Sequence, residues 1–182
     1  MKIIGLDQST TATGVSVYVD GELKGYMLIK PKSSKKADEI KTDWESYLLN
    51  IIMPEEDYGT TLLRITAITD VIETILTQEK PDVVYFEEIY QSRNPKGFRS
   101  LARLQGFIAH ICHQLGIRYC IIEESKWINY WGTYGSGVGR TERKADIMQK
   151  INDLYGLNIT VDDISDSIAI GGYAVSIEEK GE

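Results

Sequence analysis

The sequence predicts an α/β fold: a mixed, five-stranded sheet flanked by helices, in a single domain spanning residues 1–182. Short apolar runs typical of buried strands alternate with longer segments whose apolar residues recur every three or four positions, as on one face of a helix. The pair Asp20-Gly21, set between two alternating segments, is a strong signal for a tight hairpin. A chain of this length is sufficient for one domain with a sizeable core.

Five segments carry the apolar or alternating pattern of strands. They are residues 3–6, 15–19, 23–29, 83–86 and 117–122. The first run suits a strand buried on both faces of a sheet, and Asp7 ends it with a charge. Residues 8–14 are small and polar, as in a turn. Asp20-Gly21 then predicts that the third strand runs back along the second.

Helical periodicity marks the segments between and after these strands. The clearest examples are residues 60–79, 97–115 and 141–154. Thr141 is the expected N-cap of the third helix and Gly156 its stop. A short helix is expected to start near Glu123, and a last helix carries Asp163 and Asp166.

The segment around residues 30–59 is interpreted as a variable insertion. Its first part is polar and resembles a loop. Its second part has apolar side chains at helical spacing: Trp44, Tyr47, Leu48, Ile51 and Ile52. We predict a surface loop with one amphipathic helical turn, bounded by Pro54 and Gly59.

Acidic residues recur where buried segments end. Asp7 follows the first strand, and Glu87 and Glu88 follow the fourth. Successive strand residues point to opposite faces, so Glu87 and Glu88 cannot both face one site. Asp163 and Asp166 lie three apart, on one face of the last helix. Four carboxylates in this setting, Asp7, Glu87, Asp163 and Asp166, suit a pair of Mg²⁺ or Mn²⁺ ions that hydrolyse a phosphodiester.

Each acid also has a simpler explanation. A lone aspartate such as Asp7 often caps a turn, and an acidic first turn complements the dipole of a helix. Neither explanation accounts for acids at the ends of two strands and at one helix together. The participation of Glu88 or Asp162 stays open at this point.

Positive charge is concentrated in one part of an acidic protein. The net charge is −7, yet residues 89–150 hold ten of the twenty Lys and Arg and only four of the twenty-seven Asp and Glu. This distribution favours a basic face that binds nucleic acid, although a solvated helix face is the simpler reading. Tyr90 lies in a loop with Arg93 and Lys96 and can stack on a base, although a half-buried loop tyrosine is the commoner case. Candidate DNA contacts are Tyr90, Arg93, Lys96, Arg99, Arg103, Arg140, Arg143 and Lys144.

Membrane and secretory signals are absent from the sequence. No apolar run approaches 18 residues, and the amino terminus lacks the charged and apolar regions of a signal peptide. We therefore expect a cytoplasmic protein with no membrane partner.

Three motifs in order resemble the RuvC family of Holliday-junction resolvases, which has the RNase H-like fold. The family opens with an apolar strand, an aspartate and a turn leading to Thr-Gly, and residues 6–14 read Leu-Asp-Gln-Ser-Thr-Thr-Ala-Thr-Gly. Its second acid precedes an apolar and an aromatic residue, as in Phe-Glu-Glu-Ile-Tyr at residues 86–90, which selects Glu87. Its closing Asp-x-x-Asp motif resembles Asp-Ile-Ser-Asp-Ser-Ile-Ala-Ile at residues 163–170.

This resemblance implies a structure-selective endonuclease that nicks Holliday junctions, in DNA recombination and repair, with Mg²⁺ or Mn²⁺, two ions per site. It implies a homodimer, an aromatic contact at the junction from Tyr90, and basic contacts from Lys126, Arg143 and Lys144. Phage-encoded members resemble this chain more closely, which extends the expected substrates to three-way junctions and replication forks in the host cytoplasm. The chain departs from the family in Gln8-Ser9, which replaces Pro-Gly, and in the length of residues 30–59.

Two rival interpretations differ in class. The acetate/sugar kinase and chaperone ATPase superfamily shares a similar opening, but it needs a glycine-rich phosphate loop there and a second, duplicated domain, for which 182 residues leave no room. A non-catalytic protein that binds branched DNA is the other alternative. Metal-dependent nicking of a four-way junction distinguishes it from a nuclease.

Overall fold

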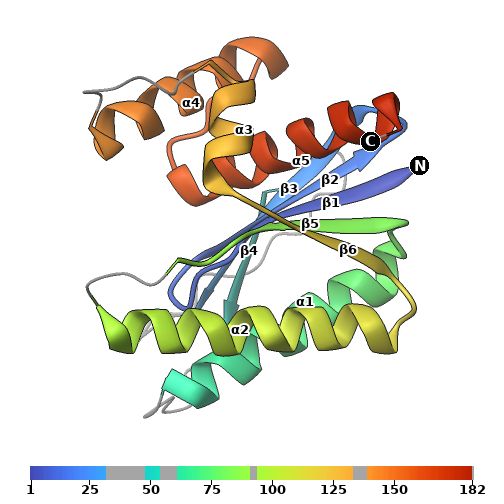
Figure 1. The fold of residues 1–182 in the computed structure, drawn as a ribbon, viewed down its shortest axis with the longest axis vertical. Coiled ribbons are helices and arrows are strands. Elements are labelled where there is room, and N and C mark those ends of the chain that lie inside the picture. Colours follow the sequence, from blue (N-terminus) through green and yellow to red (C-terminus); the bar gives the residue numbers. More distant parts are fainter. Residues whose placement is uncertain (32–47, 54–60, 91–93, 133–138, 182) are drawn as a thin grey trace.

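The structure, a computed structural model, describes residues 1–31, 48–53, 61–90, 94–132 and 139–181. One mixed sheet has the strand order β4-β3-β2-β1-β5-β6 (Figure 1). Its strands are β1 (Lys2–Asp7), β2 (Thr13–Val19), β3 (Glu22–Pro31), β4 (Leu48–Met53), β5 (Val83–Glu87) and β6 (Arg118–Ile122). The first three strands are antiparallel, whereas β5 runs parallel to both β1 and β6.

Helices cover both faces of this sheet, which confirms the predicted α/β architecture. They are α1 (Thr61–Glu79), α2 (Pro95–Gln114), α3 (Glu124–Tyr130), α4 (Arg140–Tyr155) and α5 (Asp162–Lys180). Figure 1 shows α1 and α2 on one face, and α5 with α3 and α4 on the other. Among the described residues, no helix is both long and apolar enough to cross a membrane.

The predicted hairpin is confirmed in detail. Val19 pairs with Glu22, so the loop consists of Asp20 and Gly21 alone. Both have positive φ, at 51° and 84°, which is the conformation of the tight turn that matches the twist of two antiparallel strands.

The helical turn predicted near residue 50 is wrong. Residues 48–53 form β4, which pairs in parallel with β3 from Tyr26 and Leu48 to Pro31 and Met53. Helical spacing and a short apolar run are hard to tell apart in sequence, and the edge of β3 offers backbone groups that a strand can pair with. β4 is thus a sixth strand added to the five expected. The rest of the interpreted insertion, residues 32–47 and 54–60, lies outside the described residues.

The start of α4 also differs from the prediction. Gly139, not Thr141, occupies the N-cap, and its amide donates to the Glu142 carboxylate at 3.2 Å. Thr141 therefore lies inside the first turn. The predicted stop is confirmed, because Gly156 has the left-handed conformation, with φ of 65°, in which a glycine commonly ends a helix.

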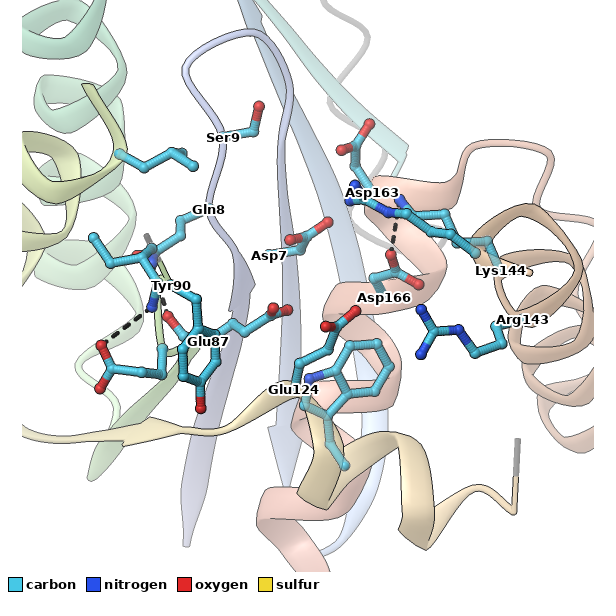
Figure 2. Close-up of a pocket in the computed structure, with 15 residues that line it drawn as sticks. Asp7, Gln8, Ser9, Glu87, Tyr90, Glu124, Arg143, Lys144, Asp163 and Asp166 are labelled. Atoms are coloured by element: carbon cyan, nitrogen blue, oxygen red, sulfur yellow. Dashed lines mark hydrogen bonds and ion pairs between the residues drawn. The ribbon is translucent and has the colours of Figure 1, made fainter. Parts of the chain in front are cut away.

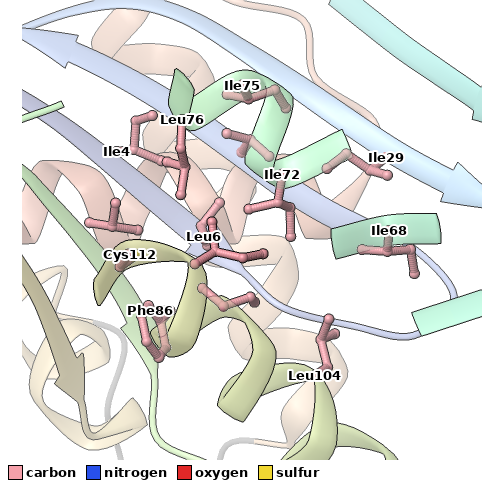
Figure 3. Packing of buried hydrophobic residues seen from close by; sticks show 14 of the residues in the cluster. Ile4, Leu6, Ile29, Ile68, Ile72, Ile75, Leu76, Phe86, Leu104 and Cys112 are labelled. Carbon is pink, nitrogen blue, oxygen red and sulfur yellow. The ribbon is translucent and has the colours of Figure 1, made fainter. Parts of the chain in front are cut away.

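The side chains of the central strands alternate between two apolar clusters. Ile4 and Leu6 pack against α1 and α2 (Figure 3), and Val84 and Phe86 of β5 join the same cluster. Ile3 belongs to the cluster on the α5 face. Because the side-chain period of a strand is two, the residue after Leu6 is directed toward α5. Asp7 is that residue.

Helix α5 lies unusually close to the sheet. A Cβ added to Gly14 would lie 1.8 Å from the backbone oxygen of Asp163, and one added to Gly5 would lie 2.6 Å from the oxygen of Ser167. The Ser16 hydroxyl donates to the same Ser167 oxygen at 2.7 Å. Small residues thus let the helix backbone touch β1 and β2, and this contact places its first turns beside the end of β1.

We predict that Gly14→Ala destabilises the protein strongly, whereas Gly106→Ala does not. The added methyl group at Gly14 meets backbone, and forced overpacking costs roughly 3 kcal/mol. At Gly106, in α2, nothing lies within 4 Å, so alanine should raise stability by roughly 0.5–1 kcal/mol through its better helix propensity. Urea denaturation measures both variants. Equal midpoints would contradict the close contact at Gly14.

Candidate active site

Two of the predicted acids lie side by side at one end of the sheet. β1 and β5 are parallel, and Leu6 pairs with Phe86, so Asp7 and Glu87 follow at the same level. Tyr85 belongs to the apolar cluster on the α5 face, so Glu87, two residues later, is directed to that face too. Figure 2 shows both carboxylates converging from neighbouring strands.

The other two predicted acids reach the same place from α5. Asp163 and Asp166 lie in the first turns of this helix, and Asp166 is only 5% exposed. All four acids line one cavity of about 420 Å³. Its lining is Asp7, Gln8, Ser9, Glu87, Glu88, Ile89, Tyr90, Leu101, Glu124, Trp127, Arg140, Arg143, Lys144, Asp163 and Asp166. The structure therefore brings together four carboxylates from three distant parts of the sequence.

Burial and mutual repulsion favour the protonated form of these acids. Burial raises the pKa of Asp7 well above its ordinary range, and the charges of Asp166 and Glu87 raise it further. Burial, followed by the charge of Glu124, raises the pKa of Glu87 to about 7. Burial also raises the pKa of Asp166 to about 6, although Lys144 opposes this. A site that resists holding several negative charges is suited to bind a cation.

Lys144 is a basic residue of this cavity that contacts one of the four acids directly. Its ammonium contacts Asp162 at 2.6 Å. It also contacts Asp166 at 3.2 Å, as Figure 2 shows. Burial lowers the pKa of Lys144, but the hydrogen bond to Asp162 and the charge of Asp166 outweigh it and leave the pKa above its ordinary value. Lys144 thus stays charged and occupies one oxygen of Asp166.

The donor set fits a divalent cation in chemistry and burial. The second oxygen of Asp166, Oδ1, is buried and has no hydrogen-bond partner in the described part of the chain. Carboxylate oxygens are the ligands that Mg²⁺ and Mn²⁺ prefer. Within residues 1–31, 48–53, 61–90, 94–132 and 139–181, no three acidic, histidine or cysteine side chains are yet grouped as ligands of one ion. Three of these carboxylates would therefore have to come closer together to bind one ion.

Two neighbouring acids, left open by the sequence, have other contacts. The Glu88 carboxylate accepts a hydrogen bond from the amide of Ile89 at 3.2 Å, and Asp162 binds Lys144. The Glu88 carboxylate is therefore bound to the next backbone amide, and Asp162 fixes the position of the Lys144 ammonium.

The predicted basic residues divide into two groups. Arg140, Arg143 and Lys144 line the acidic cavity together with Tyr90, which is 58% exposed. The others described do not line it: Lys96, Arg99 and Arg103 are exposed on α2, and Lys126 is exposed on α3. Arg93 lies outside the described residues. The cavity thus has a basic wall from α4, and α2 carries a separate basic face.

Two residues of the cavity were missed by the sequence analysis. Gln8 is buried, and its amide nitrogen donates to the backbone oxygen of Glu87 at 2.8 Å, which ties the end of β1 to the end of β5. Glu124 follows β6, which runs parallel to β5. The rule that identified Asp7 and Glu87, an acid just after a buried strand, does not find Glu124, because β6 is largely exposed and Glu123 comes directly after it.

Comparisons with solved structures define the class of the fold. Thermus thermophilus RuvC in complex with a Holliday-junction substrate superposes with a TM-score of 0.66 at 17% identity, covering 100% of this chain and 97% of that one. The yeast mitochondrial Holliday-junction resolvase gives 0.55 at 14%, covering 98% and 79%. Fowlpox virus resolvase with its junction DNA gives 0.52 at 15%, covering 97% of each chain. The chain therefore has the RNase H-like fold of these resolvases.

The family assignment comes from the sequence itself. Residues 2–176 match the family described as Lactococcus phage M3 protein. This chain belongs to the Lactococcus phage M3 protein family. No curated protein sequence gives a match.

Proposed function

We propose that this protein is a structure-selective endonuclease that nicks Holliday junctions and other branched DNA by metal-dependent hydrolysis. The observation that carries the proposal is the convergence of Asp7, Glu87, Asp163 and Asp166 on one cavity, beside a basic wall, in the fold of junction resolvases. The acids alone or the fold alone would not support a nuclease function, because one fold can carry unrelated functions.

The four carboxylates would hold Mg²⁺ or Mn²⁺, two ions per site, as catalytic ligands. When bound, such ions activate a water and stabilise the leaving oxygen of a phosphodiester. Asp7 and Glu87 come from the centre of the sheet, and Asp163 and Asp166 from a helix in close contact with it. The backbone that carries the ligands is therefore fixed, and only their side chains would adjust to the ions.

The chain's basic residues would bind the DNA backbone on both sides of this cavity. Arg140 and Arg143 of α4 are close enough to the acids to bind the phosphates that flank the reacting one. Lys144 would orient Asp166 through their contact. On α2, Lys96, Arg99 and Arg103 form a second basic face for another arm of a junction. Arg93 and Lys126 are further proposed contacts.

The finer features of this proposal follow the resolvases. We propose a homodimer that nicks two opposed strands, with residues 30–59 as an insertion variable among such single-domain nucleases. The substrates would include three-way junctions and replication forks. A phage-encoded enzyme of this kind would act on recombining or replicating DNA in the host cytoplasm.

One assay tests the proposed function. Four-way, three-way and linear DNA are incubated with the protein, with Mg²⁺, with Mn²⁺ and with a chelator. We expect nicks in the branched substrates alone, and only with a divalent ion. Binding of junctions without nicking under every metal condition would favour the non-catalytic alternative, and nicking in the presence of the chelator would exclude a metal mechanism.

Tyr90→Ala should lower junction nicking without weakening metal binding. The ring is exposed at the rim of the cavity, where it can stack on a base at the branch point, and one stacked base contributes roughly 1–3 kcal/mol. We therefore expect turnover to fall at least about fivefold, with Mn²⁺ affinity unchanged. Tyr90→Phe, which keeps the ring, serves as the control. Full activity of Tyr90→Ala would give the tyrosine no role in the junction contact.

A further inference from the structure

Glu124 is a fifth carboxylate in the cavity, and it lies outside the three resolvase-like motifs. It is the first residue of α3 and follows β6 by two positions, where Ile122 pairs with Glu87. Figure 2 shows its side chain directed toward the middle of the group formed by Asp7, Glu87 and Asp166. Parallel strands thus bring a third strand-end acid to the same edge of the sheet.

A role in helix capping does not explain this position. An acid in the first turn stabilises a helix through the dipole, but Glu123 at the N-cap already supplies a charge there. Glu123 is exposed, its carboxylate contacts the Ser125 hydroxyl at 3.3 Å, and it does not line the cavity. The helix dipole explains why an acid such as Glu123 lies at this helix start. It does not explain why the Glu124 side chain is directed into the cavity.

Glu124 shares its cavity with other carboxylates. Glu124, Glu87 and Asp166 line the same cavity, with Arg140, Arg143 and Lys144 on another part of its wall. Two carboxylates that share a partly buried cavity repel each other, and an interposed cation turns this repulsion into attraction for both.

An unpartnered oxygen points to such a ligand. Asp166 is 5% exposed, its Oδ2 contacts Lys144, and its Oδ1 has no hydrogen-bond partner among the described residues. Glu124 and Asp166 line the large cavity together, and they also share a neighbouring cavity of about 20 Å³. A buried acceptor without a donor is costly, so this oxygen is available to a cation.

We propose that Glu124 completes a divalent-cation site with Glu87 and Asp166. This inference rests on the proposed function, to which it adds one ligand beyond the four of the resolvase-like motifs. Glu87 and Glu124 each have three side-chain torsions, so both can rotate onto an ion near the buried Asp166 oxygen. Glu124 would then be a third ligand at the end of the sheet where Asp7 and Glu87 lie.

Titration with Mn²⁺ alone tests the proposal, using the full chain without DNA and isothermal titration calorimetry. Three proteins are compared: wild type, Glu124→Gln and Glu123→Gln. The two variants remove the same charge from adjacent positions of one helix start, and only the first faces the cavity. We expect Glu124→Gln to bind Mn²⁺ at least about tenfold more weakly, or to lose one ion per chain, since even outer-shell partners of a metal carry tenfold effects. Glu123→Gln should bind as wild type does.

Several outcomes separate this inference from the proposed function. Equal Mn²⁺ binding by Glu124→Gln and Glu123→Gln overturns the inference, and junction nicking by wild type in parallel shows that the proposed function survives. If wild type neither binds Mn²⁺ nor nicks junctions, both fail together. Thermal unfolding without metal checks the fold, and both glutamine variants should unfold no earlier than wild type because each removes a negative charge from an acidic region.

Discussion

Asp7→Asn should abolish junction nicking while junction binding persists. The substitution removes a proposed metal ligand at the end of β1 and keeps its size, and losing one carboxylate from a two-ion site should lower the rate at least about 10³-fold, or about 4 kcal/mol in the barrier. DNA affinity depends on positive charge, which is unchanged. Single-turnover nicking and gel-shift binding of the same four-way junction measure the two effects.

Asp70→Asn is the matched control for this experiment. Asp70 is exposed on α1, which covers the opposite face of the sheet, so the variant carries the same change in charge far from the cavity. It should nick and bind as wild type does. Loss of binding together with substantial nicking by Asp7→Asn would contradict the role assigned to Asp7.

Without metal, the protein should lose stability as the pH rises from about 4.5 to about 7. Burial and neighbouring charges raise the pKa of Glu87 from 4.5 to about 7 and that of Asp166 from 3.8 to about 6. The folded state therefore binds more protons than the unfolded state across this interval, and its free energy of unfolding falls as the protons leave. The raised pKa of Glu87 alone corresponds to a fall of roughly 3 kcal/mol in the free energy of unfolding, which accumulates between pH 4.5 and about 7.

Mg²⁺ should reverse this loss at pH 8 and have little effect at pH 5. A cation that binds only the folded, ionised site stabilises it by mass action, whereas protonated carboxyls bind it weakly. Thermal unfolding at both pH values, with NaCl matched for ionic strength, measures the difference. Asp7→Asn should show a smaller shift at pH 8. Equal stabilisation by Mg²⁺ at both pH values would mean that the ion binds elsewhere.

Local patterns predicted much of the fold. Alternation, apolar runs and the Asp20-Gly21 turn predicted β1, β2, β3, β5 and β6. Each of these signals depends only on residues that are neighbours in the sequence. The strand at residues 48–53 escaped this reasoning, since a short apolar segment becomes a strand only when a sheet edge accepts it. Threonine is a common N-cap residue, which is why the sequence predicts Thr141 as the cap. In the structure the N-cap is Gly139, whose amide donates to the Glu142 side chain.

The sequence by itself predicted four carboxylates for one site, with Glu87 chosen over Glu88 through the resemblance to the RuvC family. Asp7 and Glu87 end buried strands, and Asp163 and Asp166 share a helix face, all of which follows from periods of two and 3.6 residues. Tertiary structure alone decided that Lys144 contacts Asp166 and that Glu124 lines one cavity with Glu87. Those contacts depend on how closely α5 lies on β1 and β2 and where α3 and α4 pack beside it. Such distances arise from packing between segments far apart in the chain, which no local pattern encodes.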